Sequence, residues 1–101
     1  REYNVEITDV VCSARVEEKI QRLHWVNVQE VEEVFWNFPE FRRGPRRKRA
    51  SGYLYHALGQ TDAGRYLFVV FIYDRRNRLA LIVTAREMTN REKREYRRKH
   101  G

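Results

Sequence analysis

Three apolar runs joined by short polar links constrain the fold of this chain more than any other feature of its sequence. The runs cover residues 53–58, 65–73 and 78–85. The links at 59–64 and 74–77 contain the Gly, Asp and Asn residues that tight hairpin turns need. The pattern therefore predicts an antiparallel β-meander. Residues 67–72 are apolar without interruption, so we expect the second run to be the most buried strand, covered on both faces.

The N-terminal part of the chain predicts one strand and one helix. Tyr3, Val5 and Ile7 alternate with polar residues, which is typical of a short strand with one buried face. A helix is expected to begin between Asp9 and Ser13, since both residue types are common N-caps. Its buried stripe is predicted at helical spacing and consists of Val16, Ile20 and Leu23.

Capping signals predict two further helices. Asn27 and Glu30 have the spacing of a capping box, and the apolar face that follows predicts a helix that ends before the next proline. Thr89 and Glu92 repeat the same spacing. They predict a last, strongly charged helix that reaches about Lys99.

Residues 41–52, between the helices and the meander, are polar and contain a basic run at 42–49, which predicts a loop or a frayed edge hairpin. The expected architecture is α+β, in a single domain over residues 1–101. It consists of an N-terminal short strand and two helices, an antiparallel meander of three or four strands, and a C-terminal basic helix.

The charge of the chain is divided unevenly. The sequence has 21 Lys or Arg and 14 Asp or Glu residues, a net charge of +7. Residues 1–41 hold four basic and nine acidic residues, a balance of −5, whereas residues 42–101 hold seventeen basic and five acidic ones, a balance of +12. Most of the basic residues are arginine, which binds phosphate in a bidentate way, so the second part favours a polyanionic partner.

Several classes of protein and site are disfavoured by composition. No apolar run approaches the ~18 residues of a membrane-spanning helix, and no charged-then-apolar leader opens the sequence, so we expect a cytoplasmic protein without a membrane partner. Cys12 is the single cysteine, which excludes an internal disulfide and gives no sign of structural zinc. Asp62 and Asp74 fall in separate turns, which disfavours a two-metal nuclease. We expect no metal and no cofactor.

Metal-free cleavage of RNA needs a different set of residues. RNA supplies its own nucleophile, the 2′-hydroxyl, so the protein has to orient the phosphate, stabilise the added negative charge and move protons. Arginine serves the first two needs, and His, Tyr or Glu serves the third. The candidate catalytic residues are His56, Arg65, Arg86, Glu92 and Tyr96. General RNA binding is expected of the basic residues Arg42, Arg43, Arg46, Arg47, Lys48, Arg49 and Arg94.

Each catalytic candidate also has a purely structural interpretation. His56 fits a surface histidine in an alternating strand, and Arg65 fits a solvated strand start. Arg86 fits an ion pair with Glu92, which would cap the last helix in any case. Tyr96 fits the packing anchor of that helix.

Several segments follow one another in a recognisable order and cover most of residues 16–98. They are His24-Trp25-Val26, Val31-Glu32-Glu33-Val34-Phe35, Leu58-Gly59-Gln60-Thr61, Gly64-Arg65-Tyr66-Leu67-Phe68-Val69-Val70-Phe71, Ile82-Val83-Thr84-Ala85-Arg86-Glu87-Met88-Thr89, and then Glu92 and Tyr96. In this order and spacing they resemble the BrnT-type toxins of bacterial toxin–antitoxin modules, which are relatives of the RelE/ParE superfamily.

The resemblance implies a RelE-like toxin fold and a toxin that cleaves RNA and thereby inhibits translation. By position in the motifs, Arg65 and Arg86 look like the phosphate-binding strand arginines of the superfamily. His56 falls where relatives place basic residues, and Tyr96 lies near the position of a proton-transfer tyrosine. The implied partners are a cognate acidic, DNA-binding antitoxin and the RNA substrate, with the ribosome, a homodimer or a larger complex with antitoxin as further candidates.

Two other functions fit the same sequence. One is a non-catalytic nucleic-acid-binding domain whose basic run and last helix contact phosphates. The other is a degenerate toxin whose basic face serves only to hold an acidic antitoxin. Within the superfamily, gyrase poisoning is a further possibility that DNA damage would reveal.

Overall fold

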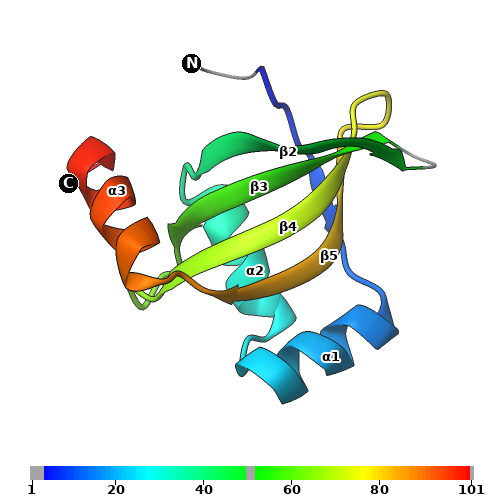
Figure 1. The fold of residues 1–101 in the computed structure, drawn as a ribbon. Coiled ribbons are helices and arrows are strands. Elements are labelled where there is room, and N and C mark those ends of the chain that lie inside the picture. The colour runs from blue at the N-terminus through cyan, green and yellow to red at the C-terminus, as the bar shows by residue number, and fades with distance from the viewer. Residues whose placement is uncertain (1–3, 50–51, 101) are drawn as a thin grey trace.

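The predicted meander forms the greater part of a five-stranded sheet, and the fold is α+β as expected (Figure 1). The computed structural model describes residues 4–49 and 52–100, and of residues 46–49 only the backbone. The elements, in chain order, are β1 (Asp9–Val11), α1 (Ala14–His24), α2 (Val28–Trp36), β2 (Glu40–Arg49), β3 (Gly52–Gln60), β4 (Tyr66–Asp74), β5 (Leu79–Glu87) and α3 (Asn90–His100).

The strands follow the order β1-β5-β4-β3-β2 across the sheet. Strands β2 to β5 pair with one another in antiparallel fashion, and short connections join β3 to β4 and β4 to β5, as the turn residues predicted. β1 pairs with β5 in parallel over three residues, at the opposite edge from β2. The four-stranded antiparallel meander is therefore confirmed.

The helices divide between the two faces of the sheet. α1 and α2 pack on one face, which we call the helix face, and α3 lies at one end of the other, which we call the open face (Figure 1). On the helix face, Phe71 of β4 is completely buried and its ring meets that of Phe35 of α2 edge-on at 5.1 Å. Burial of such rings is a main source of stability in a domain of this size.

The predicted caps hold the helices at their first residues. The Ser13 hydroxyl accepts a hydrogen bond from the Val16 amide and begins α1. Asn27 and Glu30 form the complete reciprocal capping box of α2. Thr89 and Glu92 do the same for α3. Each cap satisfies backbone amides that have no partner within the helix.

The N-terminal strand was predicted in the wrong place. Tyr3 lies outside the described residues, and Val5 and Ile7 pack against the core without forming a strand. The parallel pairing with β5 is made further on, at Asp9–Val11. The alternation therefore predicted which side chains face inward but not which residues form the ladder, because inward-facing side chains alone do not require pairing.

Two burial predictions also need correction. Ile20 of α1 is fully buried and Val16 partly, but Leu23 is 53% exposed because α1 ends one residue later, at the corner between the two helices. In β4 only alternate residues are buried, so the strand is covered fully on the helix face alone. On the open face, Tyr66 and Phe68 are half-buried beneath α3.

The basic run forms an edge strand that pairs with β3, which corresponds to the edge hairpin of the two predicted alternatives and not to the loop. β2 pairs with β3 through Glu40–Arg43 and again at Lys48, and a bulge separates the two paired stretches. A bulge in an edge strand disrupts its ladder and disfavours pairing with another molecule. In the described part of the chain, no helix is long and apolar enough to cross a membrane.

Candidate functional site

The sheet register brings two of the predicted residues, His56 and Arg86, to the same aromatic ring. Phe68 of β4 pairs with Arg86 of β5, and His56 lies on the same face of the adjacent strand β3. The imidazole centroid is 4.6 Å from that of Phe68, and the guanidinium carbon of Arg86 is 4.2 Å from it. Phe68 thus forms an apolar floor that both side chains contact on the open face.

A bulge in β5 is the reason that Arg86 reaches this face. Ala80 and Ile82 are buried on the helix face, and so is Ala85, three residues after Ile82. Strict alternation would bury even-numbered residues throughout the strand. The register instead shifts opposite the step from Val70 to Phe71, so that Arg86 takes an open-face position.

Glu92 fixes the guanidinium of Arg86. The two terminal nitrogens of Arg86 donate to the two carboxylate oxygens of Glu92 at 2.9 and 3.0 Å, a bidentate pair. The hydrogen bond from Arg86, outweighing the opposing effect of burial, holds the pKa of Glu92 below its ordinary value. The Arg86 side chain is 35% exposed, so solvent reaches part of it. The structure therefore contains both the ion pair between Arg86 and Glu92 and the cap that Glu92 was expected to form on the last helix.

His56 is half-buried and lies near two arginines and one glutamate. Burial lowers its pKa from the ordinary 6.5, and the charges of Arg42 and Arg86 lower it further, with Glu92 acting in the opposite direction. The imidazole is therefore neutral near pH 7 and able to accept a proton. On the adjacent strand β2, a Cβ atom on Gly44 would lie 3.3 Å from the Nε2 atom of His56, so the missing side chain leaves room for the ring.

Arg65 does not join His56, since its guanidinium is directed to the helix face. Its Nε donates to Glu87 at 2.8 Å and one terminal nitrogen donates to Glu30 at 2.9 Å. The terminal nitrogens also donate to the backbone carbonyls of Trp25 and His24, at 2.7 and 3.3 Å. Arg65 thereby clamps the corner between α1 and α2 to the end of the sheet.

Arg65 and Arg86 nevertheless border one shallow hollow. It measures about 430 Å³ and is also lined by His24, Trp25 and Glu87. Both guanidinium groups are turned toward carboxylates, Arg65 toward Glu30 and Glu87 and Arg86 toward Glu92. The two arginines are thus neighbours at the end of the sheet with different contacts.

Tyr96 anchors α3 to the open face. Its ring is buried, meets that of Tyr66 edge-on at 6.0 Å and stacks on His100 at 4.5 Å. Burial raises the pKa of the Tyr96 hydroxyl. Glu40 of β2 accepts from His100 at 3.1 Å and holds the last turn of α3. The placement of Tyr96 corresponds to its structural interpretation, with its ring packed between two others.

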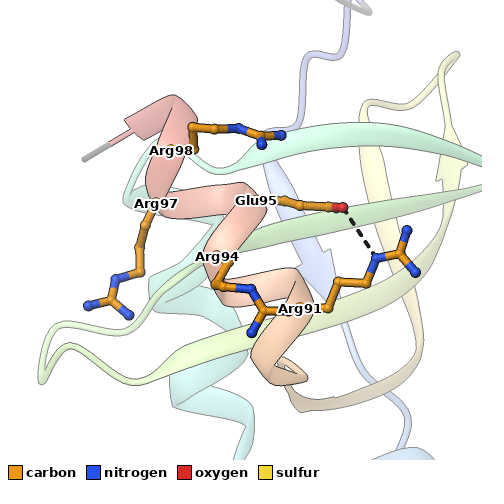
Figure 2. Close-up of a pocket in the computed structure, with 5 residues that line it drawn as sticks. All are labelled: Arg91, Arg94, Glu95, Arg97 and Arg98. Atoms are coloured by element: carbon orange, nitrogen blue, oxygen red, sulfur yellow. Dashed lines mark hydrogen bonds and ion pairs between the residues drawn. The ribbon is translucent and has the colours of Figure 1, made fainter.

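The exposed side of α3 is lined by arginines. Arg91, Arg94, Arg97 and Arg98 border a hollow of about 660 Å³ together with Glu95, which pairs with Arg91 at 3.4 Å (Figure 2). Successive arginines along one helix suit the phosphates of an extended nucleic acid.

The remaining RNA-binding candidates lie on β2. Arg42 is on the open face, beside His56, and donates to Glu40 at 2.7 Å. Arg43 is on the helix face, where it covers two tyrosine rings. The backbone of Arg46, Arg47, Lys48 and Arg49 belongs to β2, but their side chains lie outside the described part of the structure.

Sequence reasoning missed three supporting residues. Phe68 was counted only as part of an apolar run, although alternation with the buried Leu67 could have placed it on the open face. Glu30 and Glu87 hold Arg65, and their separation in sequence, 35 and 22 residues from it, left no local signal of either pair.

Comparisons with known proteins add no relative. The chain matches no model of a known protein family, and no curated protein matches it. The resemblance to BrnT-type toxins therefore stays a prediction. Across the described residues, no group of three or more His, Cys, Asp or Glu side chains is placed to hold a metal ion.

Proposed function

We propose that this protein is a metal-independent endoribonuclease, the toxin of a type II toxin–antitoxin pair, that acts in the cytoplasm and inhibits translation. The single observation that carries the proposal is the pair of His56 and Arg86 on the ring of Phe68. It combines an imidazole that is neutral near pH 7 with a cation that a carboxylate holds in place. These are the two groups that attack by a 2′-hydroxyl requires.

In the proposed reaction, His56 accepts the proton of the 2′-hydroxyl while that oxygen attacks the adjacent phosphorus. The bond from phosphorus to the 5′-oxygen of the next nucleotide breaks, and this oxygen takes up a proton from water as it leaves. The products are a 2′,3′-cyclic phosphate and a 5′-hydroxyl end. Arg86, held by Glu92, and Arg42, next to His56, stabilise the negative charge that develops on the phosphate.

Arg65 has a positioning role in this proposal. Its four partners on the α1–α2 corner and on β5 keep the end of the sheet in place beside Arg86. Tyr96 likewise positions α3, from which Glu92 reaches Arg86. An acidic antitoxin would be attracted by the same basic surface that attracts RNA.

Cleavage of RNA by purified protein in the presence of EDTA tests the proposal. Mapping of the RNA ends should show cyclic phosphates, and His56→Ala and Arg86→Ala should each lower the rate at least 100-fold. Arg15→Ala, which removes an exposed arginine on α1, is the matched control and should cleave like wild type. Intact RNA in the wild-type reaction, with no growth arrest on expression, contradicts the proposal.

The arginines of α3 favour a second candidate, a nucleic-acid-binding domain without catalysis. Phosphate contacts along α3 alone give binding that weakens steeply with salt. Such binding without cleavage, unchanged by His56→Ala, would support this candidate instead. A protein that neither cleaves nor binds RNA but holds an acidic antitoxin would be a degenerate toxin.

A further inference from the structure

A cavity of about 490 Å³ lies far from α3, at the other end of the sheet. Its lining includes Asp74, Arg75 and Arg76, at and just after the end of β4, and in Figure 1 the connection between β4 and β5 lies at the end of the sheet away from α3. Tyrosines and arginines dominate its lining: Arg43, Tyr53, Tyr55, Tyr73, Arg75 and Arg76. Its volume is in the range of small-ligand sites.

The floor of the cavity is a cluster of aromatic rings with a cation above them. The Tyr55 and Tyr73 rings meet edge-on at 5.5 Å. The guanidinium carbon of Arg43 lies 4.6 Å from the ring centroid of Tyr53 and 5.4 Å from that of Tyr55. Tyr53, which lines the cavity, is 40% exposed, so part of its side chain is accessible from solvent.

The cavity carries an excess of positive charge. Among the described residues Arg43 has no carboxylate partner, in contrast to Arg42, Arg65 and Arg86, and its buried Nε has no hydrogen-bond acceptor. Arg75 and Arg76 are exposed at the rim. Opposing them is Asp74, whose two carboxylate oxygens accept hydrogen bonds from the backbone and side chain of Asn77. Three arginines thus face one carboxylate that already has partners.

We propose that this cavity binds one nucleotide of a single-stranded RNA, outside the group formed by His56 and Arg86. The base stacks on the exposed ring of Tyr53 next to Arg43, and Arg75 and Arg76 bind the adjoining phosphate. Stacking on tyrosine and arginine together with phosphate contacts is how proteins hold single strands of nucleic acid. That the ligand is RNA rests on the function proposed above.

The edge strand β2 connects this cavity to the proposed catalytic group. Arg42 lies on the open face beside His56, and Arg43 lies on the helix face in the cavity. Tyr53 is three residues from His56 along β3, a distance of about 10 Å at the usual rise per residue. A strand of RNA that passes over the edge at β2 therefore contacts both sites within a few nucleotides.

The lining favours a nucleotide over an acidic peptide. A carboxylate side chain would pair with the arginines but would not stack on the exposed part of the Tyr53 ring. A nucleobase can stack there, and its phosphate can bind the arginines at the rim. The same cavity thus matches both parts of a nucleotide.

Binding of a short single-stranded 2′-O-methyl oligoribonucleotide tests this inference, because the blocked 2′-oxygen prevents cleavage by internal attack. Fluorescence anisotropy of the labelled oligonucleotide should show roughly tenfold weaker binding to Tyr53→Ala, the loss of one stacked base. Tyr53→Phe keeps the ring and should bind within about twofold of wild type. Arg75→Ala/Arg76→Ala, on the exposed connection, should bind more weakly and with a shallower salt dependence.

Arg15→Ala is the control for the loss of an exposed positive charge, and circular dichroism shows whether each variant is folded. Wild-type affinity in both Tyr53→Ala and Arg75→Ala/Arg76→Ala overturns the inference, and so does binding of a polyglutamate peptide but not of the oligonucleotide. If the wild-type protein cleaves no RNA but Tyr53→Ala binds the oligonucleotide more weakly, this inference stands and the proposed endoribonuclease is overturned. If the wild-type protein cleaves RNA but the variants bind the oligonucleotide as tightly as wild type, the proposed endoribonuclease stands and this inference is overturned.

Discussion

Removal of the Arg65 side chain separates two views of this residue. If Arg65 is the clamp that its contacts describe, Arg65→Ala should lower the free energy of unfolding by about 3 kcal/mol. The basis is that Arg65 and Glu30 are each only 23% exposed, and loss of a hydrogen bond to a partly buried charged group costs about 1.5–3 kcal/mol. The pair with Glu87, whose side chain is 58% exposed, adds a few tenths at most, about what a surface pair contributes. The carbonyls of Trp25 and His24 lose a donor and regain it in part from water.

Urea unfolding followed by circular dichroism measures this change. The midpoint should fall while the denaturant dependence m stays the same, because the fold itself is retained. Arg65→Lys keeps the charge but lacks the planar fork that reaches several acceptors, so it should lose about half as much stability. Arg22→Ala breaks an exposed pair with Glu18, at 60% and 64% exposure, and should change the free energy by less than about 0.5 kcal/mol.

The clamp is refuted if the free energy of unfolding of Arg65→Ala is within about 0.5 kcal/mol of the wild-type value. Should the same variant have lost RNA cleavage, Arg65 would bind phosphate directly, as its position in the motifs implied. Loss of both stability and cleavage, with cleavage recovered in Arg65→Lys to the extent that stability is recovered, would support the positioning role.

Three further predictions follow from individual environments. If His56 accepts the proton, the cleavage rate should fall as the pH is lowered from 6.5 through its depressed pKa, and a profile that is flat there would contradict this role. The lowered pKa of Glu92 stabilises the fold above the ordinary value of 4.5, and this contribution is lost as the pH falls through the folded pKa. Glu92→Gln should therefore be less stable than wild type at pH 7, and the difference should shrink in acid unfolding curves; a constant difference would argue against the pair with Arg86. Trp25 and Phe38 are exposed residues with φ of 58° and 54°, a backbone conformation that glycine adopts at lower cost. Trp25→Gly and Phe38→Gly should therefore each increase the free energy of unfolding by about 0.5–1 kcal/mol, which a higher melting temperature would show.

The parts of the fold that were predicted correctly depend on local signals. The capping boxes at Asn27 and Thr89 act within three residues, and the hairpins of the meander are decided by turns of a few residues. β1 was misplaced because its parallel pairing with β5 joins residues about 70 positions apart, and no local pattern encodes that choice. The predicted burial of Leu23 was wrong for a related reason. Whether the buried stripe of α1 continues to Leu23 depends on where the helix ends, at the corner before α2.

Sequence reasoning named the candidate residues, but it could not predict how they group in space. His56, Arg86 and Glu92 lie together on the open face. Arg65 immediately precedes β4, and the alternation of that strand directs its side chain to the helix face. The tyrosines of the second cavity gave no functional signal, because tyrosine in a strand is ordinary and only the neighbouring arginine makes it a binding surface.

The bulge in β5 is the feature of the candidate site that the sequence does not predict. Residues 79–83 and Ala85 are all apolar, so the sequence contains no alternation from which the face of Arg86 could be read. A regular strand that buries Ala80 and Ile82 would direct Arg86 to the helix face, the side on which Arg65 is already held. The extra residue of the bulge reverses the alternation of faces after it. Arg86 therefore lies on the open face, where it contacts Phe68 and Glu92 beside His56. The grouping of His56 with Arg86 therefore depends on a backbone irregularity, and β-bulges are known to redirect a side chain in this way.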